Sequence, residues 1–318
     1  MIVKRNLRWN LILFYTWKNI LFYIIVAVVV YWVHLTSHMQ FNIPFDAITA
    51  FSTALAIFLG FKNNNAYDRW WEACNWWGLL VSQSRTWARE LIIFINSPKN
   101  EDHAEIKALQ KRLIYRQIAY VNALRVYLRR KLKYNESGQH ELFESGNEYR
   151  DAQPFLDPEE YPVFSKKENP PNYLLELHAR DLKSTIGRGW TTDYCFVRLE
   201  ETLAEFTAAQ GGCERIKNTP FPRHYSFYSR MFVFMQAIML PCAFVETMGP
   251  GMIPLTVVIS FIFCSLDLIG ERTEDPFENR LEDVPLTALC ISIETNLKEQ
   301  WGDKDLPSKA QANKGIVF

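Results

Sequence analysis

Two long stretches of this chain contain no lysine or arginine, and they limit what it can fold into. One covers residues 19–61 and the other residues 231–270, so all 35 basic residues of the 318-residue chain lie elsewhere. A charged side chain is costly at the centre of a lipid bilayer, whereas the core of a soluble protein does not impose such a division. The distribution of charge therefore predicts a membrane protein.

Each of these stretches is long enough to cross a bilayer twice. About 20 apolar residues in a helix span the hydrocarbon core, and lipid favours helices because their backbone groups bond internally. A short loop or a Gly-Pro-Gly turn divides each stretch. We therefore expect four transmembrane helices, at 20–35, 43–61, 231–247 and 253–269.

The orientation of these spans follows from the positions of the basic residues. The two short loops between paired spans contain no lysine or arginine, whereas the N-terminus, the long insert and the tail contain all of them. Basic residues concentrate on the cytosolic side of membrane proteins. We predict a multi-pass protein of the cell inner (plasma) membrane with both termini in the cytosol.

The polar parts of the chain also show helical spacing of apolar residues. We predict helices at 70–95, 103–132, 172–183, 191–216 and 286–301, the first continuing directly from the second span. The fold class is all-α, with four transmembrane helices and a large cytosolic helical region. The predicted organisation is an interfacial N-terminal helix (1–18), a hairpin (19–61) with a pore helix (43–61), a cytosolic domain (62–230), a second hairpin (231–270) and a cytosolic acidic segment, helix and tail (271–318).

Composition argues against several classes of function. The formal net charge is 0, whereas a protein that binds nucleic acid usually has a basic excess. The sequence lacks the common nucleotide-binding, metalloprotease and serine-hydrolase motifs, and none of its six cysteines forms a CxxC pair. We expect neither an enzyme nor a nucleic-acid-binding protein.

The second span has one helical face of unusual regularity. Asp46, Ala50, Thr53, Ile57 and Phe61 recur on it at steps of three or four residues, and Asn64 or Asn65 follows one turn later. One such helix from each subunit of a symmetric ring would line a pore, because four spans of one chain are few to enclose one. Ordinary packing against another helix explains the same periodicity, which does not choose between the two.

The acidic segment after the fourth span has two interpretations. Clustered carboxylates suit Ca²⁺ or another divalent cation, but the same residues would also form a solvated acidic turn before the next helix. No cofactor is required by any other feature. The candidate metal ligands are Glu274, Asp275, Glu278, Glu282 and Asp283.

Three motifs resemble the bestrophin family, in particular its prokaryotic branch. They read IFLGFKNNNAYDRWWEACNWWG, GGCERIKNTPFP and EDPFENRLEDVPLTAL, and their order and spacing agree with the family over about residues 9–301. The resemblance implies a ring-shaped homopentameric ion channel. Its central pore would pass through a transmembrane neck and a cytosolic vestibule.

The resemblance also implies roles for individual residues. Aligning the first motif without gaps places the neck at Thr53, Ile57 and Phe61, of which Thr53 departs from the apolar family pattern. Counting back from the second motif places a cytosolic aperture at Tyr194. Family members from animals bind Ca²⁺ through a run of aspartates, which here reads ENRLED, so weak or absent Ca²⁺ activation is expected.

The charges along the predicted pore favour cations. Asp46 at the outer mouth, and Asp68 with Asn64 and Asn65 at the vestibule entrance, would form negative or polar rings. We therefore predict a channel that passes monovalent ions passively and prefers cations. The alternatives are a chloride or other anion channel of the same architecture and a membrane-anchored scaffold or sensor. The expected partners are further copies of the chain, monovalent ions and the lipid bilayer, without nucleic acid.

Overall fold

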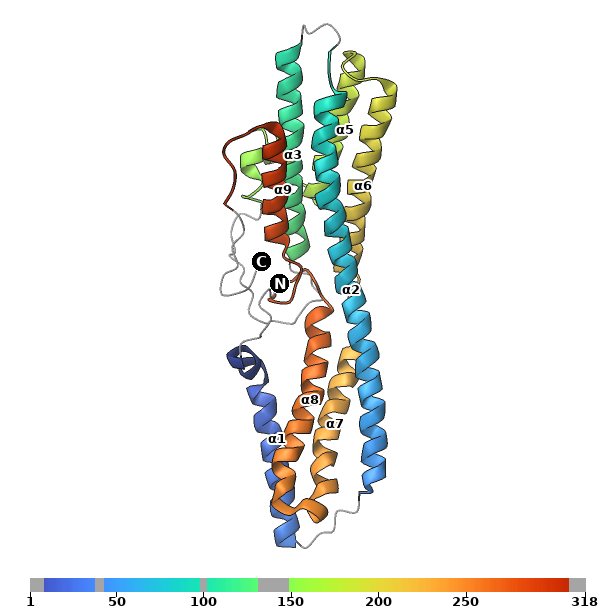
Figure 1. Ribbon diagram of the computed structural model, residues 1–318, viewed down its shortest axis with the longest axis vertical. Helices are drawn as coiled ribbons and strands as arrows, with labels where there is room; N and C mark the ends of the chain where they lie inside the picture. Colours follow the sequence, from blue (N-terminus) through green and yellow to red (C-terminus); the bar gives the residue numbers. More distant parts are fainter. Residues whose placement is uncertain (1–8, 38–42, 98–101, 131–148, 309–318) are drawn as a thin grey trace. The chain divides into compact units, whose positions relative to one another are not determined.

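The computed structural model describes residues 9–37, 43–97, 102–130 and 149–308, with side chains from Phe14 onward (Figure 1). In these ranges all regular structure is helical, which confirms the predicted all-α class. The elements are α1 (Trp9–Ser37), α2 (Phe45–Phe94), α3 (His103–Arg129), η1 (Gln153–Phe155), α4 (Tyr161–Phe164), α5 (Pro170–Gly187), α6 (Asp193–Asn218), α7 (Arg223–Met248), η2 (Gly249–Gly251), α8 (Met252–Thr273) and α9 (Leu286–Trp301).

The chain divides into two compact units. Unit 1 comprises the described parts of Trp71–Thr219 and Pro276–Phe318, and unit 2 comprises the described part of Lys4–Trp70 together with Pro220–Asp275. The helix α2 contributes its first half to unit 2 and its second half to unit 1 without a break.

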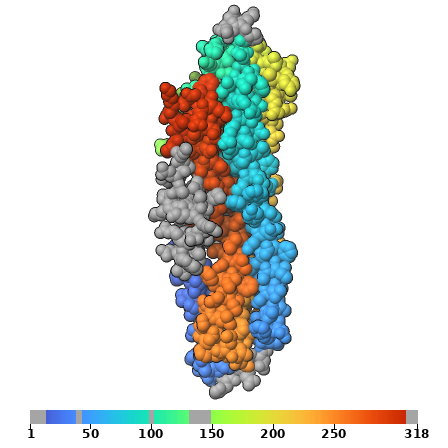
Figure 2. Space-filling model, viewed as in Figure 1, coloured from blue at the N-terminus to red at the C-terminus, as the bar shows by residue number. Residues whose placement is uncertain are grey.

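Unit 2 contains the apolar helices. Three stretches of the described chain are long and apolar enough to cross a membrane, namely Phe14–Ser37, Phe45–Phe94 and Arg223–Thr273. The third is a hairpin of α7 and α8 joined by η2, so each of the four predicted spans lies in a helix of its own. In Figure 1, α1, α8 and α7 run side by side, and Figure 2 shows the α7–α8 hairpin (orange) as a continuous surface.

The predicted N-terminal helix is part of a longer one. Its described residues, 9–18, are continuous with the first span in α1, which runs unbroken to Ser37. Neither Gly nor Pro, the strongest helix-interrupting residues, occurs between Trp9 and Ile20. Whether these residues lie at the membrane interface stays a prediction.

A small apolar core joins the four membrane helices of unit 2. Phe22 of α1 and Phe234 of α7 meet edge to face with ring centroids 5.4 Å apart, and Phe51 of α2 approaches Phe232 of α7 at 6.3 Å. Helices in lipid associate mainly through such packing, because the bilayer itself offers no hydrophobic driving force. The buried residues of this core are Tyr23, Leu55, Leu59, Val233, Ala237 and Cys264.

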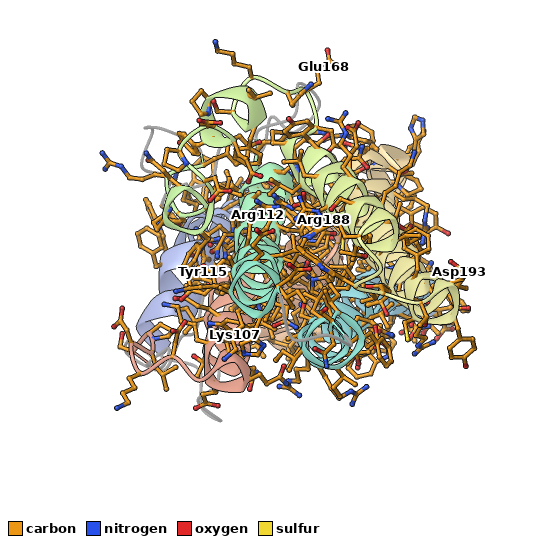
Figure 3. The ribbon with its side chains drawn as sticks, turned by 90° about the horizontal axis from the view of Figure 1, so that it is seen from above. Lys107, Arg112, Tyr115, Glu168, Arg188 and Asp193 are labelled. Atoms are coloured by element: carbon orange, nitrogen blue, oxygen red, sulfur yellow. The ribbon has the colours of Figure 1, made fainter. Side chains whose placement is uncertain are left out.

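Unit 1 is built around α3. This helix is buried on most sides and packs against α5, α6 and α9, as the view along the helices shows (Figure 3). Side-chain caps fix where two of its neighbours begin: Asn169 accepts a hydrogen bond from the Asn172 amide at the start of α5, and Thr192 accepts one from the Cys195 amide at the start of α6. These caps place both helix starts close to the predicted ones.

Candidate functional site

The first half of α2 has one side buried in unit 2 and one side exposed. Leu55, Leu59 and Lys62 lie on the buried side, whereas 57% of Ile57 and 64% of Phe61 are exposed. A helix face in contact with water normally carries polar side chains, and two large apolar side chains one turn apart do not fit that environment. This face is therefore available to another surface, to lipid or to a pore.

The structure brings the predicted pore residues together on this exposed face. All of them lie on α2, within one uninterrupted helix, and none of them packs into the interior of its own unit. Because α2 is a single helix without Pro in this region, residues spaced three or four positions apart lie on the same side of it. The residues are Asp46, Thr53, Ile57, Phe61, Asn64, Asn65 and Asp68.

Thr53 is the one hydroxyl among the three predicted neck residues. Its Oγ1 donates to the backbone oxygen of Thr49 at 2.8 Å, and Thr49 Oγ1 donates in turn to the oxygen of Phe45 at 3.0 Å. A hydroxyl that bonds back to its own helix is less available to water in front of the helix. Thr53 thus departs less from the apolar pattern than its residue type suggests.

A buried ion pair holds the opposite side of α2. Lys62 Nζ lies 2.8 Å from Asp267 Oδ1 on α8 and 2.9 Å from Ser229 Oγ on α7. Next to it, Asn63 Nδ2 donates to the Leu266 oxygen at 3.0 Å. Sequence reasoning did not select Lys62. The signal was present, because a lone aspartate near the end of an apolar span requires a cationic partner.

Tyr194, the predicted aperture residue, belongs to unit 1. It is the second residue of α6 and 84% of it is exposed. The preceding residue, Asp193, lies at the edge of the helix group in Figure 3. The structure therefore leaves Tyr194 free to face a partner or a solvent-filled passage.

The acidic segment is paired rather than gathered around one point. Glu278 lies 2.6 Å from Lys217 Nζ, Asp275 lies 3.9 Å from Arg69, and Glu274 accepts a hydrogen bond from Ser226 at 2.9 Å. Within the described ranges, no group of three or more His, Cys, Asp or Glu residues is placed to hold a metal ion. Most of these candidate carboxylates thus have protein partners.

Asp283 differs from the rest because it is almost completely buried. Its Oδ2 accepts a hydrogen bond from the Arg280 amide at 3.0 Å, while its Oδ1 has no partner among the described residues. Burial raises the pKa of this carboxyl to about 7, against the lowering effect of Arg280. Near neutral pH, part of the population therefore carries a neutral Asp283.

Comparison with known proteins identifies the family. The family model for the bacterial and fungal bestrophin protein matches residues 9–299. The chain belongs to the bestrophin family. The resemblance of the three motifs is thereby confirmed, and since members of this family are channels, the expectation that the chain is not an enzyme is confirmed as well.

Several bestrophin relatives match most of the chain. The voltage-dependent anion channel-forming protein YneE of Escherichia coli is 31% identical over 291 residues, which are 92% of this chain and 87% of that protein. A voltage-dependent anion channel-forming protein of Mesorhizobium japonicum is 32% identical over 273 residues, 85% of this chain and 79% of its own. A crystal structure of a bacterial bestrophin homologue from Klebsiella pneumoniae superposes with a TM-score of 0.78 at 26% identity, covering 92% of this chain and all of that one.

These relatives bear on the predicted ion selectivity. Both curated bestrophin relatives are named as anion channels, so the alternative prediction of an anion channel is better supported than the predicted preference for cations. The cation argument used the charges of Asp46 and Asp68, which assume that both carboxylates face the permeating ion.

Proposed function

We propose that this bestrophin is the subunit of a homopentameric channel that passes monovalent anions passively through a central pore. The observation that carries the proposal is the face of α2 on which Ile57 and Phe61 stay largely exposed while the other side of the same helix is buried. Five such faces around one axis form a closed ring, since a rotational interface repeats until it meets itself.

In this proposal the neck of the pore is lined by Thr53, Ile57 and Phe61. Each residue would contribute one collar, spaced by one helical turn along the axis. Apolar collars of this kind restrict conduction by excluding water. Because they carry no charge, they do not choose between anions and cations, and selectivity has to arise elsewhere along the pathway.

The remaining predicted residues would serve the two ends of the neck. Asp46 would lie at the outer mouth, Asn64, Asn65 and Asp68 at the entrance of the vestibule, and Tyr194 at a cytosolic aperture. This assignment places the chain in the inner membrane with both termini in the cytosol, in agreement with the distribution of basic residues.

Anion passage is proposed because the named relatives form anion channels. A cation channel is the second candidate, and the exposed carboxylates of Asp46 and Asp68 favour it. The deciding experiment is the reversal potential of purified channels in a planar bilayer under an NaCl gradient. A reversal near the chloride equilibrium potential supports the proposal, and one near the sodium potential replaces it with the second candidate.

Assembly is tested separately from selectivity. The mass of the detergent-solubilised protein, measured by light scattering or native mass spectrometry, should equal five chains. A monomer or dimer that still binds a partner protein would instead favour a membrane-anchored scaffold.

A further inference from the structure

Polar groups without a partner meet in the core of unit 1. The Trp87 ring of α2 and the His178 ring of α5 lie with their centroids 5.2 Å apart at an interplanar angle of 77°, and both side chains are fully buried. Among the described residues, neither Trp87 Nε1 nor either ring nitrogen of His178 has a hydrogen-bond partner. Such groups are rare in native cores, because an unmade hydrogen bond is costly there.

The helix α3 adds a further unpartnered polar atom to the core of unit 1. Gln117 Nε2 donates to Ser84 Oγ at 2.9 Å, and Ser84 lies one helical turn before Trp87 on α2. The other amide atom of this side chain, Gln117 Oε1, is buried without a partner in the described chain. Three helices, α2, α3 and α5, therefore each contribute unpaired buried polar atoms to the core of unit 1.

The nearby charged groups do not supply the missing hydrogen bonds. Arg116, the neighbour of Gln117, pairs with Glu160 and, at 2.7 Å, with Asp181, which lies one turn after His178. Asp181 also forms a salt bridge with Arg112 at 3.1 Å, and Figure 3 shows Arg112 on the side of α3 toward α5. These charged side chains are therefore paired with one another.

Counting donors and acceptors identifies the missing partner. Burial, and secondarily the charge of Arg116, lowers the pKa of His178 well below its ordinary value, so the ring is neutral. A neutral imidazole has one donor and one acceptor, Trp87 Nε1–H only donates, and Gln117 Oε1 only accepts. The unpaired set thus comprises two donors and two acceptors, which matches a molecule that accepts two hydrogen bonds and donates two.

The surroundings restrict that molecule to a small and uncharged one. Phe206 of α6 packs against Trp87 with ring centroids 6.1 Å apart and against Tyr120 at 6.0 Å. No described group of His, Cys, Asp or Glu residues suits a metal ion. Buried water commonly fills sites of this kind, with two to four hydrogen bonds to otherwise unsatisfied groups.

We propose that ordered water binds between Trp87, His178 and Gln117 and bridges α2, α3 and α5. The site belongs to the interior of unit 1 and uses none of the residues assigned to the proposed conduction pathway. It replaces direct side-chain hydrogen bonds between the three helices with water-mediated ones, which are nearly as favourable.

The first test is the thermal unfolding of full-length His178→Leu in detergent. If water bridges the three side chains, this variant strands Trp87 Nε1 and Gln117 Oε1, and Tm falls by about 3–8 °C. If the pocket is dry, the variant removes an unsatisfied imidazole and Tm rises, which overturns the proposal. His103→Leu, at an exposed position of α3, is the matched control and should leave Tm nearly unchanged.

The second test uses the unaltered protein and does not depend on how a variant folds. A structure at a resolution that shows other buried waters should have density within about 2.7–3.2 Å of Trp87 Nε1 and of one His178 nitrogen. An empty site at that resolution, with neighbouring buried waters visible, overturns the proposal. In addition, His178→Leu should lower Tm less in a Trp87→Phe background, since the donor is then already absent.

Discussion

Lys62 of α2 and Asp267 of α8 form a buried ion pair, with 2.8 Å between Nζ and Oδ1 and only 1% and 9% of the two side chains exposed. Lys62 directly follows Phe61 in the sequence and lies on the side of α2 opposite the proposed neck. Ser229 of α7 accepts a further hydrogen bond from the same ammonium group at 2.9 Å. Three membrane helices therefore meet at one lysine.

We expect the Lys62→Met variant to be strongly destabilised. The substitution leaves the Asp267 carboxylate buried without its cation, and breaking a buried pair in this way typically costs about 3–5 kcal/mol. Loss of the folded oligomer on heating, followed by fluorescence-detected size-exclusion chromatography, measures the effect. The double variant Lys62→Met with Asp267→Leu should recover most of the loss, because apolar residues of similar volume often replace such a pair without cost. A single variant as stable as the wild type would show that the pair does not hold α2.

The proposed neck predicts a gain of conduction. Replacing Ile57 and Phe61 by alanine together should raise single-channel conductance, because narrower apolar collars hinder wetting. Ile93→Ala is a suitable control, since Ile93 is an equally exposed apolar residue on the distant half of α2. If the double variant conducts no better than wild type while the assembly is intact, these residues do not line the restriction.

The sequence predicted the helices well where apolar spacing and helix-breaking residues coincide. The predicted helix at 286–301 has the same bounds as α9, and the direct continuation of the second span into 70–95 is confirmed by α2. The predicted bounds of α5 and α6 differ from the observed ones by a few residues. Apolar spacing does not show where a helix ends, whereas the Asn169 and Thr192 caps fix where these two begin.

The sequence did not predict the long-range polar contacts. Lys62 and Asp267 are separated by 205 positions, and Lys62 stands beside three asparagines that suggest a solvated helix end. His178 was one of six scattered histidines without a motif. Its burial depends on how α5 packs against α2 and α3, which periodicity alone does not specify. Hydrogen-bond and ion-pair partners that are far apart in the sequence depend on how the helices pack, which the spacing of apolar residues does not specify.

The GGCER motif contains a glycine that the packing requires. A Cβ at Gly212 of α6 would clash with the Trp76 ring of α2, whereas one at Gly211 would meet nothing within 4 Å. We expect Gly212→Ala to destabilise the protein by about 1–3 kcal/mol through overpacking. Gly211→Ala is the matched control and should be neutral or stabilising by up to about 1 kcal/mol, because alanine favours a helix. Equal melting temperatures for the two variants would contradict the close approach of α2 and α6.

Asp283 predicts a pH dependence of stability. Burial raises its pKa to about 7 in the folded state, above the ordinary value of an unfolded chain. The folded state then binds more protons between about pH 4 and pH 7, so its stability falls as pH rises through that window and is constant above it. Asp283→Asn should flatten this part of the Tm–pH profile and raise Tm at pH 8 by about 3–6 °C. A profile identical to wild type would show that Asp283 is solvated.

The paired acidic segment predicts that Ca²⁺ does not activate the channel. Glu278 is neutralised by Lys217, Asp275 lies near Arg69, and the family run of aspartates is interrupted by Arg280. Ca²⁺ binds where several oxygen ligands converge, and no such group occurs in the described residues. Channel open probability in a bilayer should therefore be the same in a chelator and in about 1 mM Ca²⁺, a concentration that fills even weak protein sites. A Ca²⁺-dependent increase that Asp283→Asn abolishes would instead locate a metal site in this segment.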